Sequence, residues 1–254
     1  MRLGRLEWRV VRVLNFDHYE KISVATDIVV LTTDDKPLGN NRKVAEKGLQ
    51  ILLAKRDEDP HKDYWALPAG FVNVHESLID CAKRKLREKV GLENIFMEQL
   101  YTYGDDAERD ERGRVISVAY IALAPKEEIT LNSEQASKES EWFWVEPSTN
   151  EWRADTLKFI SVSDPSIEVE HLAFDHRAII ADALNRIKNK IMYTDIAFNL
   201  VNKQFTVKEL QTVYELLLGR EVQAFRRVMS DKIVETDNWT DGKAHRPARL
   251  FKQK

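Results

Sequence analysis

Cysteines, long apolar runs and an N-terminal apolar block are scarce or absent in this sequence. Its 254 residues include one cysteine, Cys81, which excludes an internal disulfide framework. No apolar run is long enough to cross a bilayer, and the first 16 residues interleave arginines with apolar residues, unlike the apolar block of a signal peptide. We therefore expect a soluble, cytoplasmic globular protein without a membrane partner.

The sequence also lacks a strong net charge, because 39 Lys and Arg residues nearly balance 42 Asp and Glu residues. Its two ends differ, however. Residues 203–254 contain 11 basic and 7 acidic residues and carry a net charge of +4, whereas residues 1–202 carry −7. A basic terminal domain on an acidic body indicates a polyanion as the partner of the C-terminal part.

Apolar and β-branched patterns predict an α/β (α+β) sandwich in the first part of the chain. Stretches rich in these residues indicate strands at 23–33, 49–56, 97–103, 115–124 and 141–146. Apolar residues recur at every fourth position between Leu78 and Val90, which predicts a helix over 77–90 that ends at Gly91. A second helix is expected over 175–192.

A second, smaller domain is predicted at the C-terminal end. Thr206 and Glu209 have the spacing of a capping box at the start of a helix that runs to Leu218. We expect a further helix over 221–230 and a hairpin with strands at 232–236 and 248–252, which together make a winged helix-turn-helix. The predicted division is an N-terminal extension at 1–22, a first domain at 23–202 and the winged helix at 203–254.

Basic side chains of the winged helix indicate DNA as its partner. Arg226 and Arg227 lie off the apolar stripe of the second helix, where a recognition helix contacts guanine edges or phosphates. Contacts to the DNA backbone are expected from residues on or beside the wing, namely Lys243, His245, Arg246 and Arg249. The alternative is a small interaction domain with ordinary surface charge.

Residues 70–92 carry a long motif with fixed spacing. The matching residues are Gly70, Glu76, Arg84, Leu86, Glu88, Gly91 and Leu92. This stretch resembles the Nudix box, and the resemblance implies a Nudix α/β/α sandwich with a mixed sheet. It also implies that Glu76 and Arg84 form an ion pair that braces the box loop on its helix.

Two lysines depart from the Nudix pattern. Nudix hydrolases have acids at what are here positions 85, 88 and 89, and these acids hold Mg²⁺ against a diphosphate. Lys85 and Lys89 change the formal charge of this set from −3 to +1. Two unit charges about 4 Å apart interact by roughly 4 kcal/mol near a protein surface, so the lysines oppose a cation. We expect no catalytic residue and no required cofactor, with Glu88 a weak candidate metal ligand.

Two alternatives to this interpretation stay open. The lysines could simply face solvent on an ordinary amphipathic helix. Hydrolysis could also persist, with Mg²⁺ as cofactor, through Glu88 or through acids such as Asp57, Glu58 and Asp59.

Three arginines, Arg109, Arg112 and Arg114, lie within six positions on a loop that enters a strand. Arginine forks suit pyrophosphate oxygens. Lysines at 85 and 89 could likewise attract a phosphate without cleaving it. The five residues are therefore candidates for ligand binding. The alternative is a charged hairpin in water, in which nearby acids pair with the arginines.

Other chemically suggestive residues receive structural interpretations. His171, Asp175 and His176 are close enough in the sequence to suggest a metal site. We favour Asp175 as the cap of the following helix, with Phe174 packed beneath it. Cys81 has no nearby His and is interpreted as a small helix residue.

Further segments carry a more specific resemblance, at 172–184, 205–219, 225–227 and 246–251. With the box, they make residues 23–251 similar to Nudix-related transcriptional regulators of the NrtR type. The resemblance implies a bacterial repressor whose Nudix domain binds ADP-ribose or another sugar phosphate and whose winged helix binds operator DNA as a homodimer. The alternative function is a Mg²⁺-dependent hydrolase of ADP-ribose or a similar nucleoside diphosphate derivative.

Overall fold

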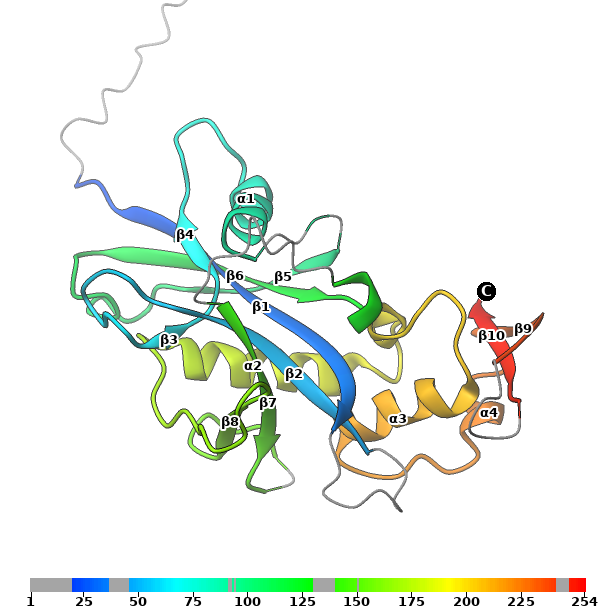
Figure 1. Ribbon diagram of the computed structural model, residues 1–254. Helices are drawn as coiled ribbons and strands as arrows, with labels where there is room; N and C mark the ends of the chain where they lie inside the picture. The colour runs from blue at the N-terminus through cyan, green and yellow to red at the C-terminus, as the bar shows by residue number, and fades with distance from the viewer. Residues whose placement is uncertain are drawn as a thin grey trace, which may run out of the picture.

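A β-sheet with helices on both faces forms the larger part of the molecule (Figure 1). The computed structural model describes residues 20–36, 46–90, 93, 95–129, 140–149, 151–240 and 247–254, without the side chains of residues 46, 89 and 90. No helix in these ranges is long and apolar enough to cross a membrane.

The sheet is mixed. Strands β1 and β6 pair in parallel, from Ser23 opposite Val115 to Leu31 opposite Leu123, and all other neighbours are antiparallel. The strand order is β5 (Phe96–Tyr103), β6 (Val115–Leu123), β1 (Ser23–Lys36), β2 (Glu46–Lys55), β7 (Ser140–Pro147) and β8 (Leu157–Ser161). Two short strands complete it: β3 (Trp65–Ala66) on β2 and β4 (Ala69–Phe71) on β1.

Strand β1 contributes to two separate cores because its side chains alternate between the faces of the sheet. Ile28 and Val30 are fully buried in one hydrophobic cluster, whereas Val29 and Leu31 are fully buried in the other. A strand buried on both faces has a continuous apolar sequence, as β1 does from Ile28 to Leu31.

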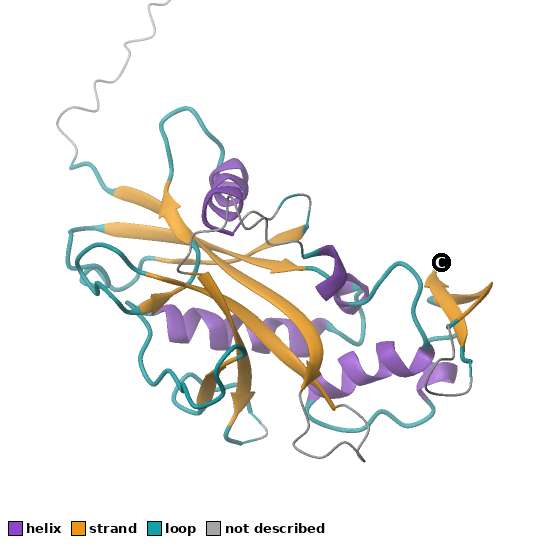
Figure 2. Ribbon diagram, in the orientation of Figure 1, coloured by secondary structure: helices purple, strands orange, loops and turns teal. Residues whose placement is uncertain are grey.

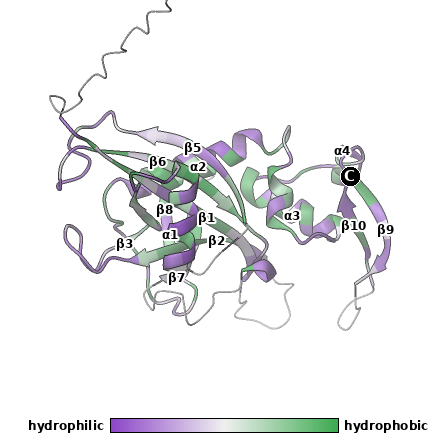
Figure 3. Cartoon of the chain, turned by 90° about the horizontal axis from the view of Figure 1, so that it is seen from above, coloured by the Kyte–Doolittle hydropathy of each residue, from purple (hydrophilic) through white to green (hydrophobic). Residues whose placement is uncertain are grey.

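Each core is covered by a helix of the sandwich. Helix α1 (Leu78–Val90) covers the first through Ala82 and Leu86, and helix α2 (His176–Lys190) covers the second through Ile179, Ile180, Ala183, Leu184 and Ile187. Viewed from above, α1 presents hydrophilic residues outward over mainly hydrophobic strands (Figure 3). The predicted α/β/α sandwich is confirmed.

The winged helix follows at one end of the sandwich (Figure 2). Its elements are α3 (Val207–Leu218), α4 (Phe225–Val228), β9 (Ile233–Trp239) and β10 (Arg249–Gln253). The predicted capping box is present, since the Glu209 amide donates to the Thr206 hydroxyl and the Thr206 amide donates to the Glu209 carboxylate.

The predicted helix over 221–230 is wrong in length. Ala224 has a φ of +51°, in the left-handed region, so a regular helix can begin only at Phe225. The amide of Val222 donates to the Glu215 carboxylate of α3, 3.1 Å away, which holds the preceding turn against that helix. Strand β8 and the short β3 and β4 were not predicted. The predicted helix stop at Gly91 lies outside the described residues.

One hydrophobic cluster runs from the sandwich into the winged helix. The connection between them contains a 3-10 helix, η3 (Ile196–Leu200), and most of its side chains are buried. Trp152 is 4% exposed, and its indole N–H donates to the carbonyl of Leu217 in α3, 3.1 Å away. Because the core continues across residue 202, the domain boundary placed there stays a prediction.

Candidate functional site

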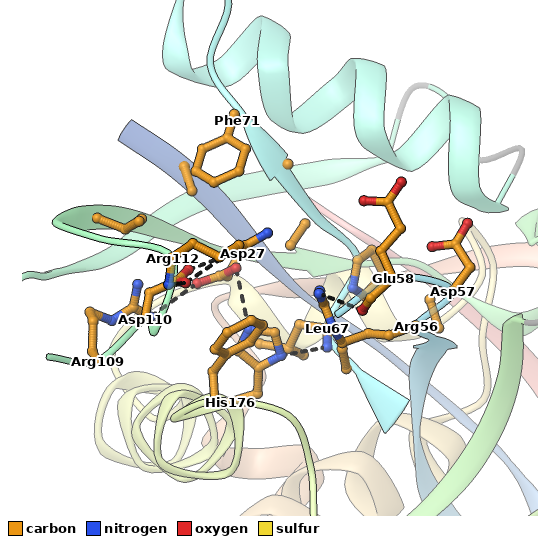
Figure 4. A pocket seen from close by; sticks show the side chains of 18 of the residues that line it. Asp27, Arg56, Asp57, Glu58, Leu67, Phe71, Arg109, Asp110, Arg112 and His176 are labelled. Carbon is orange, nitrogen blue, oxygen red and sulfur yellow. Dashed lines mark hydrogen bonds and ion pairs between the residues drawn. The ribbon is translucent and has the colours of Figure 1, made fainter. Parts of the chain in front are cut away.

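A cavity of about 180 Å³ lies between the sheet, the box loop and the start of α2 (Figure 4). Figure 4 shows Asp27, Arg109, Asp110 and Arg112 grouped on one side and Arg56, Asp57 and Glu58 on the other. The pocket thus gathers residues from β1, from the end of β2 and from the loop that follows β5.

Asp27 forms the floor of the pocket and is 4% exposed. The Ser117 hydroxyl donates to it, and Nε2 of His176 lies 3.5 Å from its Oδ1. Nδ1 of His176 accepts the amide proton of Leu67 at 2.9 Å, so Nε2 is the nitrogen that presents a proton to Asp27. Burial raises the pKa of Asp27, but His176, Ser117 and Arg109 together lower it below its ordinary value.

Arg109 links this floor to α2. Its side chain is 6% exposed, with Nη2 3.6 Å from Asp27 Oδ2. Its guanidinium binds Asp175 through two hydrogen bonds, Nε to Oδ2 at 2.9 Å and Nη2 to Oδ1 at 2.6 Å. The loop between β5 and β6 is thereby fixed to the first residue before α2.

The predicted helix cap is wrong at this point. Asp175 stands at the start of α2, but its side chain makes no capping hydrogen bond, and both of its oxygens accept from Arg109 instead. Phe174 has a φ of +53° and lines the pocket, and its ring centre lies 5.5 Å from that of His176, the first residue of α2. The described residues contain no His, Cys, Asp and Glu group that could hold a metal, and His176 is committed to Leu67 and Asp27.

Arg112 projects between two aromatic rings. Its guanidinium carbon lies 5.0 Å from the ring centre of Phe71 and 5.2 Å from that of Phe174. Its Nε donates to Asp110 Oδ1 at 2.9 Å, and its Nη2 donates to Asp110 Oδ2 at 2.7 Å. The hydrogen bonds from Arg112 hold the pKa of Asp110 below its ordinary value.

Arg56 is a pocket cation that sequence reasoning missed. Its guanidinium carbon lies 4.8 Å from the Phe174 ring centre, and its nitrogens donate to the carbonyls of Pro60 and Glu58 at 2.8 and 3.1 Å. In the described part of the chain no carboxylate forms an ion pair with it. Burial, and then repulsion by Arg112, lower the Arg56 pKa. Asp110, Asp57 and Glu58 act in the opposite direction. Arg56 is thus a pocket cation without an ion-pair partner among the described residues, in a lining that holds four acidic and four basic side chains.

The other candidate ligand residues lie elsewhere. Arg114 donates to the carbonyls of Asp106 and Gly104, so it braces the loop and does not line the pocket. Lys85 places Nζ 2.8 Å from Glu88 Oε2, and its stem packs on Gly70, where an added β-carbon would collide with Lys85 Cε. The side chain of Lys89 lies outside the described residues.

The ion pair implied by the Nudix resemblance is present in the box. Arg84 Nε donates to Glu76 Oε2 at 2.9 Å, and the Asn73 amide donates to Glu76 Oε1 at 2.7 Å. Arg84 also donates to the Phe71 carbonyl, which ties helix α1 to β4. The hydrogen bonds that Glu76 accepts, first from Arg84 and then from the Asn73 amide, lower its pKa to about 2.

The box residues do not fit the Mg²⁺ cluster of Nudix hydrolases. Magnesium takes oxygen ligands, chiefly carboxylates, water and substrate phosphate. Lys85 occupies one of the three acidic positions, and the carboxylate of Glu88 already accepts from Lys85 and Arg84. The hydrogen bond from Lys85 lowers the pKa of Glu88, and two cations beside this carboxylate oppose a third. Asp57 and Glu58 line the pocket, but Asp59 does not.

Two of the candidate DNA-binding residues contact other residues of the winged helix, and one is exposed. Arg226 contacts Glu235 and the Phe251 ring, and Arg249 donates to the Thr236 carbonyl. Arg227 is exposed. The remaining candidates, Lys243, His245 and Arg246, lie outside the described residues.

Fold and site together define a class of protein: a Nudix-type sandwich with a pocket lined by charged side chains, joined to a winged helix. Comparison with known families agrees. The NUDIX domain model matches residues 40–161, and the NrtR DNA-binding winged helix domain model matches residues 197–253.

Two relatives and one solved structure are similar to this chain. The chain is 38% identical over 213 residues to the "ADPR responsive transcriptional repressor NtrR" of Acinetobacter baylyi, covering 80% of this chain and 75% of the relative. It is 32% identical over 146 residues to an ADP-ribose pyrophosphatase of Methanocaldococcus jannaschii, covering 58% of this chain and 72% of that relative. The crystal structure of Shewanella oneidensis NrtR with a 27mer DNA is 29% identical, with a TM-score of 0.68, over 91% of this chain and 93% of that one. The chain belongs to the Nudix-related transcriptional regulators of the NrtR type.

The ion pair in the box predicts a pH-dependent stability. The Glu76 pKa falls from 4.5 to about 2 on folding. The stability that the ionised Glu76 adds to the folded state is therefore fully present above about pH 4.5 and is lost as the pH falls toward 2. We expect Glu76→Gln to melt at a lower temperature than the wild type near pH 7, and this difference to shrink below about pH 4.5. Thermal unfolding followed by circular dichroism measures both, with Glu170→Gln as an exposed control. A difference independent of pH would contradict the prediction.

Proposed function

We propose that the protein is a transcriptional repressor whose Nudix-like domain, residues 23–202, senses ADP-ribose and whose winged helix, residues 203–254, binds operator DNA. The observation that carries the proposal is a pair of guanidinium groups: Arg56 and Arg112 both lie over the Phe174 ring, and Arg56 forms no ion pair among the described residues. A diphosphate between these guanidinium groups would relieve their repulsion.

The pocket also suits the other parts of such a ligand. Phe71 is 42% exposed and, with Phe174, offers an aromatic surface for a base. Of the predicted ligand residues, Arg112 would contact the diphosphate, while the buried Arg109 would hold the loop that carries it. The names of two relatives, an ADPR responsive repressor and an ADP-ribose pyrophosphatase, support ADP-ribose as the ligand.

DNA binding is supported by the winged helix and by its net charge of +4. The related NrtR of Shewanella oneidensis, similar over nearly its whole length, was crystallised with DNA. We propose a homodimer, because two winged helices would read two half-sites of a palindromic operator. The residues predicted from the sequence to bind DNA are Arg226, Arg227, Arg249 and the wing residues Lys243, His245 and Arg246; among those that the structure describes, the exposed Arg227 is the candidate for direct contact.

Ligand binding must favour one of two arrangements of the protein, since a ligand with equal affinity for both shifts nothing. Helix α2 provides a physical connection. It begins at the pocket, where Asp175 binds Arg109, and farther along Asn185 donates to the Trp152 carbonyl at 2.7 Å. Trp152 in turn bonds to Leu217 of α3. We propose that ADP-ribose shifts this packed unit toward a state with lower operator affinity.

Removal of the Arg56 charge should weaken effector binding. We expect Arg56→Gln to raise the dissociation constant for ADP-ribose about tenfold or more, because a hydrogen bond to a charged group contributes roughly 1.5–3 kcal/mol. Isothermal titration calorimetry measures it, and Arg186→Gln, on the exposed face of α2, is the matched control. Equal affinities for Arg56→Gln and the wild type would exclude this role.

DNA binding should depend on salt and on Arg227. We expect the wild type to bind the DNA upstream of its own coding sequence, with an affinity that falls steeply as salt increases, and ADP-ribose to release it. Arg227→Ala should reduce the salt slope by about one. Fluorescence anisotropy at several salt concentrations measures both. Absence of a salt-sensitive complex would defeat the repressor proposal.

Hydrolysis provides the test against the alternative function. We expect ADP-ribose to remain intact with Mg²⁺ and the purified protein, because Lys85, beside Glu88 and Arg84, leaves no acidic cluster in the box. Phosphate-coupled or chromatographic assay of the nucleotide measures turnover. Turnover at an ordinary enzymatic rate of about 1–10³ s⁻¹, abolished by Glu88→Gln, would favour the hydrolase instead.

A further inference from the structure

Helix α4, the expected recognition helix, is too short to fix its own direction. It has four residues, Phe225–Val228, and isolated helices of this length are not stable in water. Phe225 and the following Met229 anchor one side in the core, at 3% and 1% exposure. The direction of the exposed side must therefore be set by contacts with neighbouring elements.

Arg226 supplies such a contact to the wing. Its Nη2 donates to Glu235 Oε1 in β9, and its guanidinium carbon lies 5.3 Å from the ring centre of Phe251 in β10. Phe251 is 6% exposed and is held by two backbone hydrogen bonds to Phe205, at 2.7 and 3.0 Å. One residue of α4 is thus attached to both strands of the hairpin.

The acceptor of this contact is shared within the wing. Arg249 Nε lies 3.5 Å from Glu235 Oε2 and donates to the Thr236 carbonyl at 2.9 Å. The Arg249 guanidinium carbon also lies 5.6 Å from the ring centre of Trp239. Glu235 therefore lies between two guanidinium groups, which neutralise a carboxylate that would otherwise repel DNA phosphates.

Arg227 differs from its neighbour. It is exposed, and none of the ion pairs or ring contacts found among the described residues involves it. Of the two adjacent arginines, one is engaged by the wing and the other is available to a ligand.

We propose that Arg226 is a positioning residue, which with Glu235 and Phe251 locks α4 to the wing so that Arg227 meets DNA in a fixed register. The inference rests on the proposed DNA-binding function and deepens it. A positioning residue affects the discrimination between sequences, whereas a phosphate contact affects all sequences equally and contributes to the salt dependence.

Glu235→Gln distinguishes the two roles. If Arg226 is a positioning residue, Glu235→Gln loosens α4, and the ratio of affinities for the chain's own upstream DNA and for a shuffled duplex of equal length falls about tenfold. Arg226→Ala should lower this ratio similarly and leave the salt slope unchanged. Glu221→Gln removes an exposed acid of the same domain that does not touch Arg226, and should leave the ratio at the wild-type value.

A direct contact between Arg226 and phosphate would give different results with the same variants. If Arg226 contacts phosphate directly, Glu235→Gln frees it, both duplexes bind more tightly at an unchanged ratio, and Arg226→Ala lowers the salt slope by about one. Either outcome overturns the inference. Should Arg226→Ala fail to fold, as judged by thermal unfolding, the isosteric Glu235→Gln still decides. A wild type that binds neither duplex would instead overturn the proposed function, and the inference with it.

Discussion

The site depends on the ion pairs that the buried guanidinium of Arg109 forms with two aspartates. This guanidinium lies between Asp27 of β1 and Asp175 at the start of α2, and thereby joins a loop, the central strand and a helix. A buried charge is tolerated only when it is paired, and breaking such a pair costs roughly 3–5 kcal/mol. The geometry around the pocket, including the position of Arg112, therefore follows from this buried cluster.

The same helix connects the pocket to the DNA-binding end. Helix α2 starts at the Arg109 cluster, packs against the sheet and reaches Trp152, which bonds to α3. Close-packed interiors transmit small displacements. Packed cores also change between discrete arrangements and do not deform continuously, so a small shift at one site can change the packing at another. A single core that extends from the sandwich into the winged helix is a physical basis for communication between the proposed effector pocket and the winged helix.

Local patterns were sufficient for most of the fold. The apolar period from Leu78 to Val90 predicted α1, and the Thr206–Glu209 capping box predicted the start of α3, because both depend on residues three or four positions apart. The length of α4 was not predictable in this way. It depends on Glu215, which holds the Val222 amide from the neighbouring helix, and on the left-handed conformation of Ala224.

The sequence by itself determined the Nudix family, through the spacing from Gly70 to Leu92, and the replacement of acids by Lys85 and Lys89. Only the tertiary structure decided which cations face the pocket. Arg109 binds Asp175, 66 positions away, Arg56 reaches Phe174, and Arg114 turns to its own loop. These contacts bring together residues far apart in the chain, and the choice among neighbouring arginines depends on backbone direction, which no local period of the sequence encodes.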